Sequence, residues 1–153
     1  MHKYVLLLFF CVLSVSAQNG LSIPVAKEKG ITVEHLDSIY KSAVHSEPAK
    51  AVFKTEAEQQ KLTEAYIKFL TDFGSFLLKN HFKWENATRG WNRIYIAPNG
   101  KIDYFLYSLR DLPADREKEF NRLLNLYIKD HKFPITAPVK FAQCSPVTYP
   151  KSE

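Results

Sequence analysis

The dipeptide Asn99-Gly100 is the feature that most restricts how this chain can fold. It lies between two runs rich in β-branched and aromatic residues, residues 93–97 and 101–107. Asn-Gly supplies the two positive φ angles of a type I′ turn, so the sequence predicts a tight antiparallel hairpin. A two-residue loop fixes the register, with these facing pairs: Tyr95–Tyr104, Ile94–Phe105 and Ala97–Ile102.

Both faces of this hairpin carry apolar side chains, interrupted on one of them by Asp103. A sheet that is apolar on both sides must be covered on both sides, which one helix cannot do. One predicted face carries Tyr95, Ala97, Ile102, Tyr104 and Leu106, and the other Ile94, Ile96, Phe105 and Tyr107.

Two amphipathic helices are predicted before the hairpin. Thr55 and Glu58 form a capping box, and the apolar stripe behind them predicts a helix over about residues 56–79. Thr32 is a candidate cap for an earlier helix, which Pro48 ends. Helical spacing assigns its apolar face to Leu36, Ile39, Tyr40, Ala43 and Val44.

A third helix and a last strand follow the hairpin. Asp111 and Pro113 open the helix, and its predicted buried face is Phe120, Leu123, Leu124, Tyr127 and Ile128. Residues 139–144 read as a strand bounded by Pro138 and Pro146, and flanking prolines favour an edge position. The predicted fold class is therefore α+β: a small antiparallel sheet, hairpin plus one edge strand, packed by one helix, with two N-terminal amphipathic helices.

The N-terminus predicts an exported protein. Residues 1–17 resemble a cleaved signal: Lys3 precedes the apolar run 4–13, and small residues stand at Val15 and Ala17. The run is too short to span a bilayer, so we expect a secreted or periplasmic protein without stable membrane insertion. Cleavage leaves 153 − 17 = 136 residues and lowers the net charge from +5 to +4. We expect residues 18–31 to be a flexible lead-in and 32–153 one domain, with a helical part (32–81) and a hairpin-helix-strand part (91–149).

The stretch from about residue 93 to 149 resembles the C-terminal domain of TonB-type periplasmic proteins. The residues that carry the likeness are Ile94-Tyr-Ile-Ala-Pro-Asn-Gly100-Lys-Ile102, then Lys132-Phe133-Pro134, then Pro138-Val139-Lys140-Phe141. The resemblance implies a hairpin, a helix ending in Phe-Pro, and a final strand, together with a periplasmic location. The family's Ser-Gly element after the second strand is replaced by Ser108-Leu-Arg110-Asp.

Catalytic and metal-binding patterns are weak, and we expect no enzyme activity, cofactor or metal. His81 and His131 follow predicted helix ends, where they complement free carbonyls, and His35 and His45 do not share a helix face. Acidic residues gather at the start of the third helix, where its dipole accounts for them: Asp111, Asp115, Glu117 and Glu119. Cys144 is the only cysteine left after cleavage, which excludes an internal disulfide.

Three functions remain open. The leading hypothesis is a non-enzymatic interaction module that binds another polypeptide by strand addition at Val139, Phe141 and Gln143. The second is a small-ligand or glycan pocket lined by Trp84, Trp91 and Tyr104. The third is a hydrolase with an unrecognised site, which predicts a histidine or Cys144 in a cleft beside an acidic residue; His81 or His131 would then serve Cys144.

Two further readings concern partners and modification. Lys and Arg are spread along the chain rather than gathered in a stripe, so we expect no nucleic-acid binding. Asn86-Ala-Thr88 matches the N-glycan acceptor pattern, which matters only in a host that glycosylates exported proteins. The oligomeric state is left open.

Overall fold

The chain folds around one five-stranded mixed sheet in this computed structural model, which describes residues 19–153. The expected leader, residues 1–17, lies outside them. The central strand β3 (Thr88–Ile96) is antiparallel to β4 (Ile102–Leu109) and to β5 (Phe141–Tyr149). Short strands β1 (Gly20–Ser22) and β2 (Lys41–Ser42) add in parallel outside β4 and β5, which sets the order β1-β4-β3-β5-β2.

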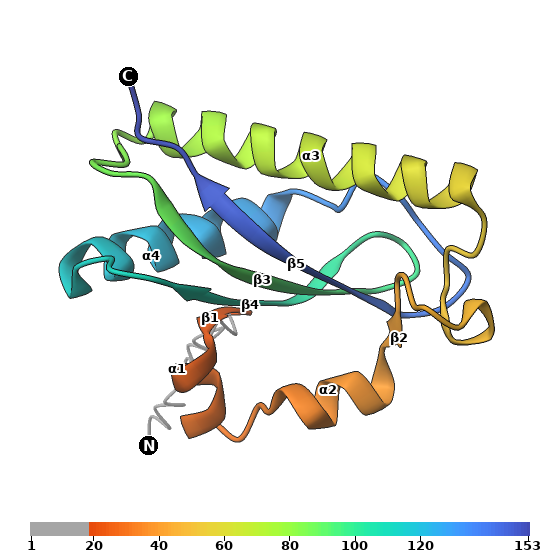
Figure 1. Ribbon diagram of the computed structural model, residues 1–153. Coiled ribbons are helices and arrows are strands. Elements are labelled where there is room, and N and C mark those ends of the chain that lie inside the picture. The colour runs from red at the N-terminus through yellow and green to blue at the C-terminus, as the bar shows by residue number, and fades with distance from the viewer. Residues whose placement is uncertain (1–18) are drawn as a thin grey trace, which may run out of the picture.

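Helices pack on both faces of the sheet, as its two apolar faces require (Figure 1). The long helices α3 (Glu56–Lys79) and α4 (Ala114–Asp130) cover what we call the first face. The short helices α1 (Ile23–Glu28) and α2 (Val33–Ile39) lie on the second face, and a 3₁₀ turn, η1 (Pro48–Lys50), leads into α3. The α+β class is confirmed, but the sheet is larger and mixed, and α3 shares the first face with α4.

The first face holds a large aromatic core. Phe69 and Phe73 of α3 contact Tyr127 of α4 with ring centroids 5.5 and 5.1 Å apart. Phe105, from the sheet, lies 6.3 Å from Phe69. The second-face cluster is much smaller, and its buried members are Leu21, Ala26, Leu36, Tyr40, Tyr95, Leu106 and Ala142.

The hairpin forms, but its turn differs from the predicted type. Gly100 has φ +83°, whereas Asn99 is not among the positive-φ residues, so this is not a type I′ turn. Pro98 fixes its own φ near −65° and therefore favours the first central position of a type I turn, one residue earlier. Tyr95 still faces Tyr104, but the bulge pairs Ile96 with Ile102, which moves Ile102 to the first face.

The two predicted helical segments with the strongest signals are confirmed. Helix α3 begins at the Thr55–Glu58 capping box and runs over the expected residues. The buried face of α4 is the predicted one. No helix within residues 19–153 is long and apolar enough to span a membrane.

Two N-terminal expectations were wrong. The lead-in is ordered from Asn19 onward, because Asn121 and Asn125 of α4 donate to the Gly20 carbonyl at 2.9 Å and Leu21 is buried. Helix α2 stops at Ile39 instead of continuing to Val44. Tyr40 turns into the sheet, where its ring lies 5.1 Å from that of Tyr95, and the next residues pair with β5.

Candidate functional site

Strand β5 has one edge paired with β3 and a second edge that is only partly covered. Strand β2 covers this outer edge only at Phe141 and Ala142. The amide of Ala43 donates to the Ala142 carbonyl at 2.9 Å, so Ala142 presents its backbone outward. The direction of the backbone N–H and C=O groups alternates along a strand, and the β3–β5 register is continuous. The backbone groups of Cys144, Pro146 and Thr148 therefore also point outward, away from β3. Within residues 19–153 no strand lies beside them.

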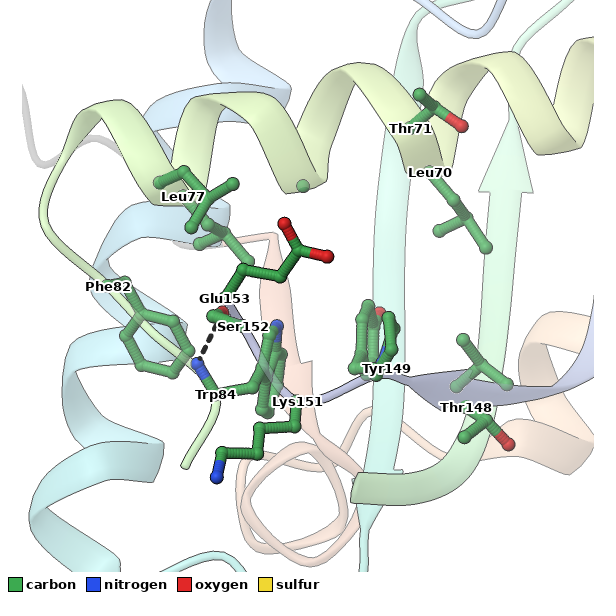
Figure 2. A pocket seen from close by; sticks show the side chains of 14 residues that line it. Leu70, Thr71, Leu77, Phe82, Trp84, Thr148, Tyr149, Lys151, Ser152 and Glu153 are labelled. Carbon is green, nitrogen blue, oxygen red and sulfur yellow. Dashed lines mark hydrogen bonds between the residues drawn. The ribbon is translucent and has the colours of Figure 1, made fainter. Parts of the chain in front are cut away.

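A half-open apolar groove runs beside the end of this uncovered edge (Figure 2). It has a volume of about 610 Å³ and lies between α3 and the chain from Val147 onward. Leu70 and Leu77 line the helix side, and Tyr149 lines the strand side. The volume falls within the range of ligand pockets, roughly 300–1,000 Å³.

Gly74 forms part of the helix wall of the groove. A glycine inside a helix costs about 0.5–1 kcal/mol relative to alanine. Packing does not require it here, since a Cβ at this position would meet nothing within 4 Å, and its φ is not positive. The glycine therefore widens the groove at a cost in helix stability.

The C-terminal segment closes one end of the groove. Trp84 stacks on Tyr149 with ring centroids 4.5 Å apart. The amide of Trp84 donates to the Ser152 hydroxyl at 2.9 Å, and the Ser152 amide donates to the Trp84 carbonyl at 2.9 Å (Figure 2). Lys151 and Glu153 place charges at this end of an otherwise apolar site.

Polar side chains lie under α3 on the first face of β3 and β5. The buried amide of Asn92 donates to the Tyr149 hydroxyl at 3.1 Å, and Gln143 donates to the Ser145 hydroxyl at 2.7 Å. The amide oxygens of Asn92 and Gln143 have no donor among the described residues. Buried acceptors without donors are costly, about 1–3 kcal/mol each, so this part of the first face favours a group that can donate.

On the second face, α2 is held by polar contacts. Asp37 accepts from the Tyr95 hydroxyl at 2.9 Å and forms an ion pair with Arg93. The Tyr40 hydroxyl donates to Asp103 at 2.7 Å. Burial and then the hydrogen bond to a carboxylate raise the pKa of Tyr40 and Tyr95 well above the usual tyrosine range.

The predicted docking residues Val139, Phe141 and Gln143 do not form an open edge, which corrects that part of the prediction. Val139 precedes the strand. The Phe141 side chain is fully buried, 5.3 Å from the Phe53 ring, and β2 pairs with its backbone. Gln143 is 8% exposed, and its backbone faces β3, because it follows the outward-facing Ala142 by one residue. The open edge lies further along the strand, because β5 continues through Pro146 to Tyr149.

The aromatic residues of the alternative pocket are not brought together. Trp84 lines the first-face groove, but it is mostly covered by Tyr149 and by Phe120. Trp91 is 50% exposed on the second face, because it alternates along β3 with the inward-facing Asn92. Tyr104 lies on the second face near Tyr95, with ring centroids 6.5 Å apart.

The residues of the hydrolase hypothesis are also separated. Cys144 is exposed on the second face, whereas His131 belongs to the first-face helix layer, stacked on Tyr127 with its Nδ1 2.8 Å from that residue's carbonyl. This contact confirms the helix-end role expected for His131. Partial burial of the sulfur raises the pKa of the Cys144 thiol, although the nearby Arg93 charge opposes this shift, and the raised pKa disfavours the nucleophilic thiolate. Residues 19–153 contain no cluster of three or more His, Cys, Asp or Glu side chains that could hold a metal ion.

Sequence reasoning missed Gly74 and Thr148. The available signal for Gly74 was a glycine in the middle of a strong helix pattern. The role of Thr148 in the open edge could not be predicted without knowing where β2 ends. Comparison of the chain with protein-family models, with curated proteins and with solved structures found no match.

Proposed function

We propose that this protein binds an extended segment of another polypeptide, without a catalytic step. The segment adds as a strand to the outer edge of β5 at Cys144, Pro146 and Thr148, and places alternate side chains in the groove beside α3. The observation that carries the proposal is that, within residues 19–153, no strand pairs with the outer edge of β5 beyond Ala142, and that the groove lies beside the end of this free edge, from Val147 onward. Strand addition obtains affinity from backbone hydrogen bonds and selectivity from side-chain pockets, and this site offers both.

Pro146 restricts which strands can pair with the outer edge of β5. Pro146 has no N–H to donate, so the outward donors of this stretch are the amides of Cys144 and Thr148. A proline in an outward position is a common protection against unspecific edge pairing. If two copies paired antiparallel about Pro146, each proline would leave a carbonyl unbonded. The geometry therefore favours a different chain over a second copy.

The proposal also includes export of the protein and a likeness of residues 93–149 to the C-terminal domain of TonB-type proteins. Strands β3 and β4, helix α4 and strand β5 follow one another in the hairpin-helix-strand order on which that resemblance rests. The apolar run at residues 4–13 supports export to a secreted or periplasmic location.

The test uses two matched pairs of variants. Thr148→Pro removes an outward donor, whereas Val147→Pro removes an inward donor of the β3–β5 ladder and serves as the fold-disrupting control. Gly74→Leu fills the groove, whereas Gly74→Ala adds one methyl group to open space. Ten-residue peptides selected from a phage-displayed random library on the wild-type protein are the probes, and calorimetry measures their Kd.

We expect Gly74→Leu to weaken peptide binding at least about tenfold while the protein stays folded. Thr148→Pro should weaken it about three- to tenfold, the value of one backbone hydrogen bond. The proposal is wrong if the selected peptides bind both variants as tightly as wild type, or if selection returns no binder. A third outcome is that an aliphatic or aromatic small molecule displaces the peptides, that Gly74→Leu weakens their binding and that Thr148→Pro does not. The groove would then bind a small ligand and not a strand.

A further inference from the structure

Part of the second face is not covered by any helix of residues 19–153, and three residues on it form a patch of unusual composition. Arg89 and Trp91 project from β3, and Arg110 follows β4; we call them the arginine–tryptophan patch. Helices α1 and α2 cover the sheet around Tyr95 and Leu106, and the patch lies beyond that cover. The patch is distinct from the groove, which lies on the first face: alternate side chains of a strand point to opposite faces, and those of Arg89 and Trp91 point to the second face.

The two arginines stand directly opposite each other. The register that pairs Gly90 with Leu109 continues by one step, and the Arg110 amide donates to the Arg89 carbonyl at 2.8 Å. Like charges facing each other across two strands are destabilising. Both side chains are exposed, and neither forms an ion pair with any carboxylate of residues 19–153. The fold therefore places two arginines opposite each other on neighbouring strands, and no carboxylate of residues 19–153 forms an ion pair with either.

Trp91 gives the same surface a large exposed aromatic ring. Its side chain is 50% exposed, and its cross-strand neighbours are the small residues Ser108 and Pro146. Tryptophan and arginine are the residue types most enriched among those that dominate the energy of protein–protein interfaces. Here both residue types occur together on the exposed part of one sheet face.

We infer that this patch docks an acidic segment of a partner protein, whose carboxylates bind the Arg89–Arg110 pair while an apolar group packs on Trp91. Guanidinium groups bind carboxylates through paired, charge-assisted hydrogen bonds, and a carboxylate between the two arginines removes their repulsion. Nucleic acids require a longer track of cations, since several phosphates must be neutralised. The neighbouring Arg93 is already paired with Asp37, so the track ends after two free arginines.

The probe for this inference is poly-L-glutamate, with poly-uridylate as the competing polyanion, measured on the full chain at low and physiological salt. The test variant is Arg89→Ser/Arg110→Ser. Its matched control, Lys61→Ser/Lys132→Ser, makes the same change in net charge at exposed lysines elsewhere. Trp91→Ser tests the aromatic part separately, with a random glutamate–tyrosine copolymer as the probe.

We expect the arginine double variant to weaken poly-glutamate binding about tenfold or more, and the lysine control less than about twofold. Trp91→Ser should weaken binding of the glutamate–tyrosine copolymer about tenfold or more. The melting temperature of the arginine double variant should equal or exceed that of wild type, because a repulsive pair is lost. The inference is overturned if the lysine control weakens binding equally, if poly-glutamate does not bind at low salt, or if the patch binds poly-uridylate more tightly. A lower melting temperature with unchanged binding would assign the arginines a structural role instead.

Discussion

The two faces of the sheet are covered in different ways. The first face is covered by two long helices, and its aromatic core spans nearly the whole sheet. The second face is covered by two short helices, which bury a small cluster, and α2 is held by polar contacts of Asp37 and Tyr40. From this difference we infer that the first face contributes most of the free energy of unfolding. Within residues 19–153 no helix covers the other half of the second face, which carries the proposed arginine–tryptophan patch (Figure 1).

The largest expected effect compares two buried leucines on helices. Leu123 of α4 is 0% exposed in the first-face core, and Leu36 of α2 is 4% exposed in the second-face cluster. We expect Leu123→Ala to lower the free energy of unfolding by about 4 kcal/mol and Leu36→Ala by about 2–3 kcal/mol. Urea denaturation measures both. Equal losses would contradict the view that the first face dominates stability.

A smaller effect is expected at the polar anchor of α2. Asp37→Ala leaves the Tyr95 hydroxyl and Arg93 without their acceptor. Because the ion pair is partly exposed, we expect a loss of only about 1–2 kcal/mol. Asp37→Asn, which keeps an acceptor oxygen, should lose less. Hydrogen exchange of the α2 amides should increase in Asp37→Ala, whereas α4 should be unchanged; faster exchange in both helices would show that the two layers are not independent.

Alkaline pH tests a buried tyrosine on each face of the sheet. Burial, and then the Asp72 charge, raise the pKa of Tyr127 from its ordinary 10.0 to about 12. The folded state holds the proton more tightly, so this stabilisation is complete below pH 10 and decreases as the pH rises towards 12. At pH 7 the Tyr127→Phe variant should therefore have the same free energy of unfolding as wild type. Above pH 10 this free energy should fall less in the variant than in wild type.

Tyr40→Phe on the second face is the counterpart. It removes the hydrogen bond to Asp103, so we expect a loss of about 1 kcal/mol already at pH 7. Urea midpoints between pH 7 and 12 compare both variants with wild type. Identical pH profiles for wild type and Tyr127→Phe would contradict the assignment of the alkaline loss to this buried phenol.

The smallest expected effect is a gain. Gly74→Ala adds a methyl group to open space in α3, so it should raise the free energy of unfolding by about 0.5–1 kcal/mol. Thermal denaturation measures the shift. A loss of stability would mean that this position packs more closely than the groove suggests, and would weaken the argument that the glycine serves binding.

The sequence by itself determined the elements whose information is local. The capping box at Thr55, the stripe of α4 and the hairpin around Gly100 were predicted because periodicity and turn chemistry act over a few residues. It did not determine β1, β2 or the length of β5. These strands form through partners distant in the chain, such as Asn125 for Gly20.

The candidate sites show the same division. The sequence indicated strand addition at the last strand, but only the tertiary structure decided which part of that edge is free, because β2 comes from residues 41–42, a hundred positions earlier. Pairing across the sheet likewise placed Arg89 opposite Arg110, although nothing in their local sequence marks them. Backbone hydrogen bonds and charge contacts between remote segments depend on the register of the whole sheet, which no short stretch of sequence encodes.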